Sequence, residues 1–430
     1  MSNSYAVEER AVLQNSKAKL FDLVCKNATK EQWTAWLTVP LEHAAAAGDV
    51  ALVNELLAAG AKGKAFWKGS YNRTLLCAAV QGGKLEVVKA LPNSGAQPDV
   101  NVLGGQRLQS PLHYAALNGC EEIAELLLLN GARPDCKDSE GTTAIHIAAE
   151  LGYQRIVSLL LIVRATVDGL RHDKTTPLHL AARKGYLAVA KLLLVAGTSM
   201  ISRNYDGYSA LDFAVMGGHV DVIRMLGEHA KGVNDGCTTL SGYKGRTALH
   251  CAAQYDQAGA VNVLVELGGD VRACILRTNN SPLHFAAKRG SCGALVALLH
   301  HKANIHAKTG DGKSPLMLAC MNLHQKAADL LLRWGADETD VDNEGRSADQ
   351  FIGAHVEIDD HEERQQDMDN MHKLLANAPA DRVWRRRGWL VLCRAIPNKA
   401  WFARVGSCSV EAGVVGLEQE VLFRHVVTFL

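Results

Sequence analysis

Residues 176–182 read Thr176-Pro177-Leu178-His179-Leu180-Ala181-Ala182, and this stretch decides the fold because the chain repeats it. Closely similar stretches, each with Thr or Ser first, His fourth and two alanines at the end, begin at Ser110, Thr143, Thr247 and Ser281. Weaker copies begin at Val39, Thr74, Ser209, Ser314 and Ser347. Five of the nine intervals between starts are 33 residues and the others are 34 to 38, so the sequence predicts a stack of about ten similar units.

Each copy predicts two short helices. In the copy quoted above, the small residues Ala181 and Ala182 let a first helix approach its neighbour closely. Gly185 then ends that helix, because glycine accepts the left-handed capping conformation. A second helix follows with an apolar stripe at helical spacing from Val189 onward, and Gly197 closes the unit. One unit cannot bury its own apolar face, so its stability must come from stacking on its neighbours.

The Thr-Pro-Leu-His-x-Ala-Ala signature at a period of 33 resembles that of the ankyrin-repeat family over residues 39–379. The resemblance implies an all-α solenoid of helix-turn-helix units joined by β-hairpin-like loops, with atypical capping ends. We expect residues 1–38 to form an N-terminal helical cap and residues 39–379 to form the array of about ten repeats, the last one degenerate. Residues 380–430 are expected to be a basic and aromatic C-terminal segment.

Composition excludes several functional classes. The chain of 430 residues has 46 Lys and Arg against 45 Asp and Glu, and this balance argues against a globally basic nucleic-acid-binding protein. No stretch of 18 apolar residues predicts a membrane span. Eleven cysteines without a Cys-x-x-Cys pair, and a charged start from Met1 to Arg10 instead of an apolar leader, predict reduced thiols and an intracellular location, cytoplasmic or nuclear.

The recurring histidine of the signature invites a metal-binding or acid–base interpretation. In the family this histidine is similar to a structural strut that hydrogen-bonds the backbone of the adjacent turn. Glu42, Cys77, Asp212 and Met317 occupy the same repeat position, which a catalytic or metal-binding role would not tolerate. Residues 310–314 resemble the end of a phosphate-binding loop, but Ala307 stands where that motif requires glycine. We therefore expect no enzyme activity, no cofactor and no metal site.

The repeat register also predicts which side chains face a partner. In this fold the loop tips and the ends of the first helices line the concave face, and four of the chain's nine tyrosines fall there. The candidate partner-binding residues are Arg183, Lys184, Tyr205, Tyr208, Tyr243, Lys244, Arg246, Tyr255, Arg277, Lys288 and Arg289. An aromatic centre with a basic rim fits an acidic or aromatic-containing peptide. The alternative is that each tyrosine packs on its own loop and the charges are merely solvated.

Two further segments bear on partner binding. The insert from Val233 to Ser241 is expected to lengthen a loop beside the tyrosines. After Pro379, four arginines between residues 382 and 387 alternate with Trp384 and Trp389. This segment is interpreted as a cap on the last repeat, as a docking segment, or as a nuclear-import or anionic-membrane patch.

The most direct function for such a chain is protein–protein recognition as an adaptor or scaffold. The alternative is a substrate-recognition subunit of a ubiquitin ligase that docks through its C-terminal segment. Leu392-Cys393-Arg394 resembles the core of a SOCS-box element, although Trp389 and Pro397 depart from that pattern. The oligomeric state stays open.

Overall fold

The structure is a computed structural model, and it describes residues 38–58, 74–91, 99–229, 234, 245–354 and 365–380. The chain divides into two compact units, residues 1–230 and residues 231–430, which we call unit 1 and unit 2. The predicted N-terminal cap and C-terminal segment lie outside the described residues, apart from Thr38 and Ala380.

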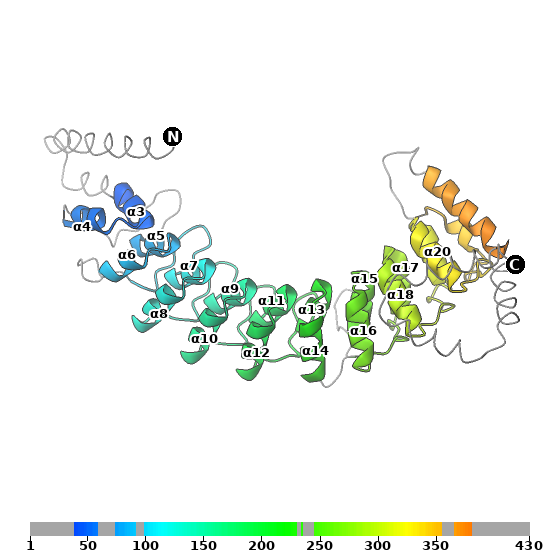
Figure 1. The fold of residues 1–430 in the computed structure, drawn as a ribbon, viewed down its shortest axis with the longest axis horizontal. Coiled ribbons are helices and arrows are strands. Elements are labelled where there is room, and N and C mark those ends of the chain that lie inside the picture. The colour runs from blue at the N-terminus through cyan, green and yellow to red at the C-terminus, as the bar shows by residue number, and fades with distance from the viewer. Residues whose placement is uncertain are drawn as a thin grey trace, which may run out of the picture. The chain divides into compact units, whose positions relative to one another are not determined.

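Unit 1 consists of successive helix pairs, each with a first and a second helix (Figure 1). Their bounds are α3 (Thr38–Ala47), α4 (Val50–Ala58), α5 (Leu75–Gln81), α6 (Leu85–Ala90), α7 (Pro111–Asn118), α8 (Glu121–Leu129), α9 (Ala144–Leu151), α10 (Gln154–Ile162), α11 (Pro177–Lys184), α12 (Leu187–Val195), α13 (Ala210–Gly217) and α14 (Val220–His229). First helices pack on first helices, as α9 does on α7 and α11. Second helices pack on second helices, as α10 does on α8 and α12.

Unit 2 continues the same pattern until its last repeat. Its pairs are α15 (Ala248–Gln254) with α16 (Ala258–Glu266), α17 (Pro282–Arg289) with α18 (Cys292–His300), and α19 (Pro315–Met321) with α20 (Gln325–Arg333). In the last repeat the first helix shrinks to a 3-10 turn, η1 (Ala348–Phe351), and residues 365–380 form a longer helix. The all-α repeat fold predicted from the sequence is confirmed over the described residues.

The core of each repeat lies between its two helices and the helices of the neighbouring repeats. Leu178 of α11 and Leu193 of α12 are fully buried, and so are the paired alanines Ala181 and Ala182. The alanines add no bulk, so first helices can stack closely while the leucines fill the space toward the second helices. Full burial of a leucine contributes roughly 1.5–3 kcal/mol, so each interface between repeats adds a separate increment of stability.

The signature histidines are structural struts, as predicted. His250 Nδ1 accepts hydrogen bonds from the Thr247 backbone N–H at 3.1 Å and from the Thr247 hydroxyl at 2.9 Å, and its Nε2 donates to the Asn280 carbonyl at 3.0 Å. Nδ1 must be unprotonated to accept a backbone N–H, so the proton is on Nε2. The same arrangement recurs at His113, His146, His179 and His284.

Each strut joins one repeat to the loop of the next. Burial lowers the pKa of all five histidines, and it lowers that of His146, His250 and His284 to about 4. These rings are therefore neutral at physiological pH, and their nitrogens are fully occupied in holding the array together.

Candidate functional site in unit 1

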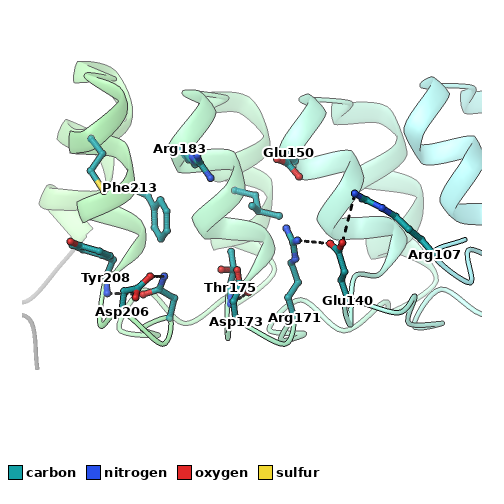
Figure 2. A pocket seen from close by; sticks show the side chains of 13 residues that line it. Arg107, Glu140, Glu150, Arg171, Asp173, Thr175, Arg183, Asp206, Tyr208 and Phe213 are labelled. Carbon is teal, nitrogen blue, oxygen red and sulfur yellow. Dashed lines mark hydrogen bonds and ion pairs between the residues drawn. The ribbon is translucent and has the colours of Figure 1, made fainter. Parts of the chain in front are cut away.

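A hollow of about 540 Å³ opens in unit 1 between the loop tips and the first helices α9, α11 and α13 (Figure 2). Its lining combines charged, aromatic and aliphatic side chains from four consecutive repeats. The residues that line it are Arg107, Glu140, Glu150, Arg171, Asp173, Thr175, Leu180, Arg183, Asn204, Asp206, Tyr208, Phe213 and Met216.

Backbone hydrogen bonds fix the loop tips beside one another along the hollow. Ser139 N–H donates to the Arg107 carbonyl at 2.9 Å, and His172 N–H donates to the Glu140 carbonyl at 3.0 Å. Tyr205 N–H continues the series by donating to the Asp173 carbonyl at 3.0 Å. The tips thus form a linked edge with one bond per repeat, which holds their side chains at regular spacing.

Glu140 links three repeats through ion pairs. Its carboxylate lies 3.7 Å from Arg107 and 3.1 Å from Arg171, and the two arginines come from the repeats on either side (Figure 2). This arrangement occupies both guanidinium groups at one end of the hollow. One carboxylate faces two guanidinium groups, so the cluster of these three side chains keeps one net positive charge.

Aromatic side chains occupy the other end of the hollow. The Tyr208 and Phe213 rings meet edge to face at 6.2 Å, and Phe213 also meets the His179 ring at 5.5 Å. Met216 lies beside them on α13. Tyr208, Phe213 and Met216 are half-buried, so they offer apolar surface to a ligand without forming part of the closed core.

Negative charge slightly exceeds positive charge in the lining. Four carboxylates (Glu140, Glu150, Asp173, Asp206) face three guanidinium groups (Arg107, Arg171, Arg183). Burial alone would raise the pKa of Asp173, but hydrogen bonds from Thr175 and the charge of Arg171 outweigh it, and the pKa is lowered. Asp173 is therefore ionised at neutral pH.

The candidate partner-binding residues of unit 1 lie in or beside this hollow. Arg183 and Tyr208 line it, and Lys184 is exposed at the end of α11. Tyr205 is 59% exposed, and the Lys174 ammonium lies 4.8 Å above its ring. These positions are accessible to a partner.

The candidate residues of unit 2 are placed differently. Tyr255 and Arg289 line a hollow of about 460 Å³, and Arg277 and Lys288 are exposed. The prediction that Arg246 belongs to an exposed basic rim is wrong, because this residue is only 5% exposed.

The surroundings of Arg246 explain its burial. Its guanidinium stacks 5.5 Å from the Phe285 ring centre and donates to Gln254 Oε1 at 2.7 Å. Arg246 therefore packs between repeats.

Tyr243, Lys244 and the insert from Val233 to Ser241 lie outside the described residues, except for Asn234. The predicted cluster of four tyrosines is thus divided: Tyr205 and Tyr208 belong to unit 1, and Tyr255 to unit 2. The basic residues behind the expectation of an acidic partner lie mostly in unit 2 as well. The preference for an acidic peptide stays a prediction for that unit.

Sequence reasoning missed Arg107, Arg171 and Phe213 as residues of the site. A signal existed for Arg107, which precedes Glu140 by one period of 33 residues and so occupies the same loop position. Phe213 gave no such signal, because its position in the first helix holds buried residues such as Leu180 in another repeat.

Within the part of the chain that the structure describes, no group of three or more His, Cys, Asp or Glu side chains is arranged to hold a metal ion. Among the same residues, no helix has both the length and the apolar character needed to cross a membrane.

A stack of similar helix pairs with an open, side-chain-lined hollow defines the class of this molecule: a helical repeat protein. The family model for ankyrin repeats in three copies matches residues 41–138, 112–204, 165–237, 198–275 and 271–342. The chain therefore belongs to the ankyrin-repeat family. Arrays of this kind bind partners on extended surfaces, which supports a role in protein interaction.

Similar curated proteins share only part of their length with this chain. The Drosophila melanogaster Neurogenic locus Notch protein is 38% identical over 76 residues, 17% of this chain and 3% of that protein. The Mus musculus B-cell lymphoma 3 protein homolog is 36% identical over 95 residues, 22% of this chain and 21% of that protein. The Homo sapiens Neurogenic locus notch homolog protein 1 is 31% identical over 118 residues, 27% of this chain and 4% of that protein.

Replacing Glu140 with alanine is expected to lower the free energy of unfolding by about 1 kcal/mol or less, because exposed ion pairs contribute little. Urea denaturation followed by circular dichroism would measure this. A loss above about 2 kcal/mol would show that Glu140 is a structural element of the array, and not a surface residue that is available to a partner.

Proposed function

We propose that this chain is a non-catalytic adaptor or scaffold that binds a segment of another protein in the hollow of unit 1. The observation that carries the proposal is that the signature side chains and the side chains of the hollow have different roles. The signature residues, including all five histidines, are buried and engaged in stacking. Apart from Thr175 and Leu180, the side chains that line the hollow are half-buried or exposed, and they combine aromatic, aliphatic and charged groups as binding surfaces do.

A double substitution of Tyr205 and Tyr208 with alanine should abolish capture of a specific partner while the melting temperature stays nearly unchanged. Large aromatic side chains at the centre of an interface each contribute about 2 kcal/mol or more, so the loss should be at least about tenfold. Affinity capture from cells followed by mass spectrometry would compare the variant with the unchanged chain.

A matched control is Ile162→Ala, which removes a 74% exposed aliphatic side chain from the end of α10. This variant should retain every partner, since Ile162 does not line the hollow. If the tyrosine variant keeps all specific partners, or if both variants lose the same ones, the hollow is not the binding site.

The ubiquitin-ligase alternative depends on residues 380–430, which lie outside the described part of the chain apart from Ala380. It is tested by comparing the full chain with one that ends at residue 380. Elongin-like or cullin-like proteins captured only by the full chain would favour the ligase subunit. An intracellular location, cytoplasmic or nuclear, accompanies either function as a prediction.

A further inference from the structure

An aromatic ring fills the same joint between neighbouring repeats at four places among the described residues. The joint lies where the glycine after a first helix meets the residue just before the second helix of the next repeat. The four pairs are Gly119 with Tyr153, Gly152 with Tyr186, Gly185 with His219, and Gly290 with His324. A Cβ added to any of these glycines would lie 2.7 Å or less from a ring atom, so each ring lies directly against its glycine.

The two imidazole rings also form a hydrogen bond inside their joints. His219 Nε2 lies 2.9 Å from the Arg183 carbonyl oxygen, and His324 Nε2 lies 3.1 Å from the Lys288 carbonyl oxygen. A carbonyl oxygen only accepts, so Nε2 is the donor in both cases. The joint between repeats therefore accommodates a flat ring that carries a hydrogen-bond donor.

One joint of unit 2 departs from this pattern on both sides. Asp256 stands in the place of the glycine, with φ +55°, and Ser291 stands in the place of the ring. The Asp256 Cβ takes the inner position that a ring occupies elsewhere, and the small Ser291 side chain leaves the outer part of the joint open. A hollow of about 460 Å³ lies here, at the ends of the first helices α15 and α17. Its lining consists of Gln254, Tyr255, Asp256, Arg289, Gly290 and Ser291, and we call it the Asp256 hollow.

Three side chains of the Asp256 hollow keep groups that can bind a ligand. Asp256 Oδ1 accepts the Ala294 N–H at 2.8 Å, and the second carboxylate oxygen accepts no hydrogen bond from the described residues. Tyr255 is 37% exposed, and its ring contacts no other ring in the same part of the chain. Arg289 is exposed and has no ion pair with any described residue. A phenol ring, a carboxylate oxygen and a guanidinium group therefore line one hollow.

The two charges of the hollow favour a neutral ligand group. A carboxylate from a partner would pair with Arg289 but would be repelled by Asp256, and a cation would meet the opposite conflict. A neutral aromatic ring with a donor satisfies both, because a cation is attracted to the face of a ring and a carboxylate accepts from its donor. Tyrosine has this chemistry, and the chain itself uses tyrosine rings at two of the four filled joints.

We propose that the Asp256 hollow binds a tyrosine side chain of a partner protein. The phenol ring lies between Tyr255 and the Arg289 guanidinium, and its O–H donates to the second oxygen of Asp256. This ring lies further out than the chain's own rings, because the Asp256 Cβ fills the inner position. The contact goes beyond the function proposed above, whose binding site lies in unit 1.

Three small probes test the proposal: N-acetyl-tyrosinamide, N-acetyl-phenylalaninamide without the O–H donor, and N-acetyl-glutamic acid amide with a carboxylate. Ligand-observed NMR with the full chain is expected to give the tyrosine probe a dissociation constant of about 1 mM or below. The phenylalanine probe should bind about tenfold more weakly, since it cannot donate to a carboxylate. The glutamate probe should not bind in this range.

The double variant Asp256→Gly/Ser291→His rebuilds the pair that Gly290 and His324 form at the next joint. The chain's own ring then fills the hollow, so binding of the tyrosine probe should be lost while the melting temperature stays equal or rises. Lys288→Ala is the matched control. Lys288 is an exposed cation next to Arg289 that does not line the hollow, and its replacement should leave probe binding within about twofold.

Asp256→Asn keeps an acceptor for the Ala294 N–H and removes the charge, so it tests the proposal even if the double variant does not fold. It should reduce the preference for the tyrosine probe over the phenylalanine probe from about tenfold to about twofold. The proposal is overturned if the tyrosine probe does not bind, if it binds no more tightly than the phenylalanine probe, or if a folded double variant still binds it. Capture of partners through Tyr205 and Tyr208 concerns unit 1, so failure there is a separate result.

Discussion

Lowering the pH from 7 to 5 is expected to reduce the free energy of unfolding, summed over both units, by roughly 6 kcal/mol. His146, His250 and His284 have pKa values of about 4 in the folded chain against 6.5 for an exposed histidine. At pH 5 the unfolded chain takes up these three protons and the folded chain does not. Each histidine then costs roughly 2 kcal/mol of stability.

The direction of this pH effect on stability follows from the hydrogen bonds of the histidines. His250 Nδ1 accepts the Thr247 N–H, so a proton on Nδ1 would face another donor and break the bond. Because the folded-state pKa is lowered, the stabilising contribution is complete above the unfolded pKa of 6.5 and is lost as the pH falls toward about 4. Asp173, whose pKa is lowered by its hydrogen bonds, adds to the loss only at more acidic pH.

Thermal melts at pH 7, 6 and 5 would measure the effect. His250→Gln should reduce the pH dependence of the free energy of unfolding by the contribution of one histidine. Glutamine can keep one hydrogen bond of the strut, since Gln350, at the same repeat position, accepts the Ser347 N–H with its Oε1. A melting temperature that is constant from pH 7 to 5 would contradict the strut assignment.

Replacing Gly312 with alanine is expected to destabilise unit 2 by about 2–5 kcal/mol. Gly312 has φ +81°, a left-handed conformation that costs a residue with a Cβ about 1–2 kcal/mol. The new Cβ would also lie 2.6 Å from the backbone nitrogen of Asn343, in the next loop tip. This neighbouring atom belongs to the backbone, so a side-chain rotation cannot move it away. The hydrogen bond from the Asn343 N–H to the Asp311 carbonyl must therefore shift.

Gly345→Ala is a matched control, one period further along the chain. Its φ of +78° is nearly the same, but a Cβ there meets nothing within 4 Å. This variant should lose only the conformational cost of about 1–2 kcal/mol. Urea denaturation of both variants would separate the conformational cost from the cost of the contact. Equal losses of stability in the two variants would show that backbone conformation, and not contact between loop tips, dominates at Gly312.

Much of the fold could be predicted because its signals recur at one period. Residues 176–182 identify a first helix, and related stretches 33 residues earlier and later, at 143–149 and 209–215, identify its neighbours. The comparison between repeats also argued that His179 is not catalytic, since the next repeat holds Asp212 at that position, whereas its role as a strut was implied by the resemblance to the ankyrin-repeat family. The structure confirms both over the described residues, and it adds that only a 3-10 turn stands in place of the first helix after Ser347.

The site could be predicted only in part. The register correctly identified Arg183 and Tyr208 as accessible positions in unit 1, because exposure follows from the place of a residue within its own repeat. It failed at Arg246, whose burial depends on Phe285 of the next repeat. It also gave no account of charge pairing, because Arg107 and Arg171 reach Glu140 from two different repeats.

By itself, the sequence determined the repeat and the alternation of short helices, and its resemblance to the ankyrin-repeat family implied the structural role of the signature histidines. These features depend on local patterns that every unit repeats. Only the tertiary structure decided which charges form ion pairs, which arginine is buried and which side chains line the hollow of unit 1. The physical reason is that these properties arise between side chains about 30 to 40 residues apart, whose distances are set by the stacking of whole repeats and not by the sequence of any one of them.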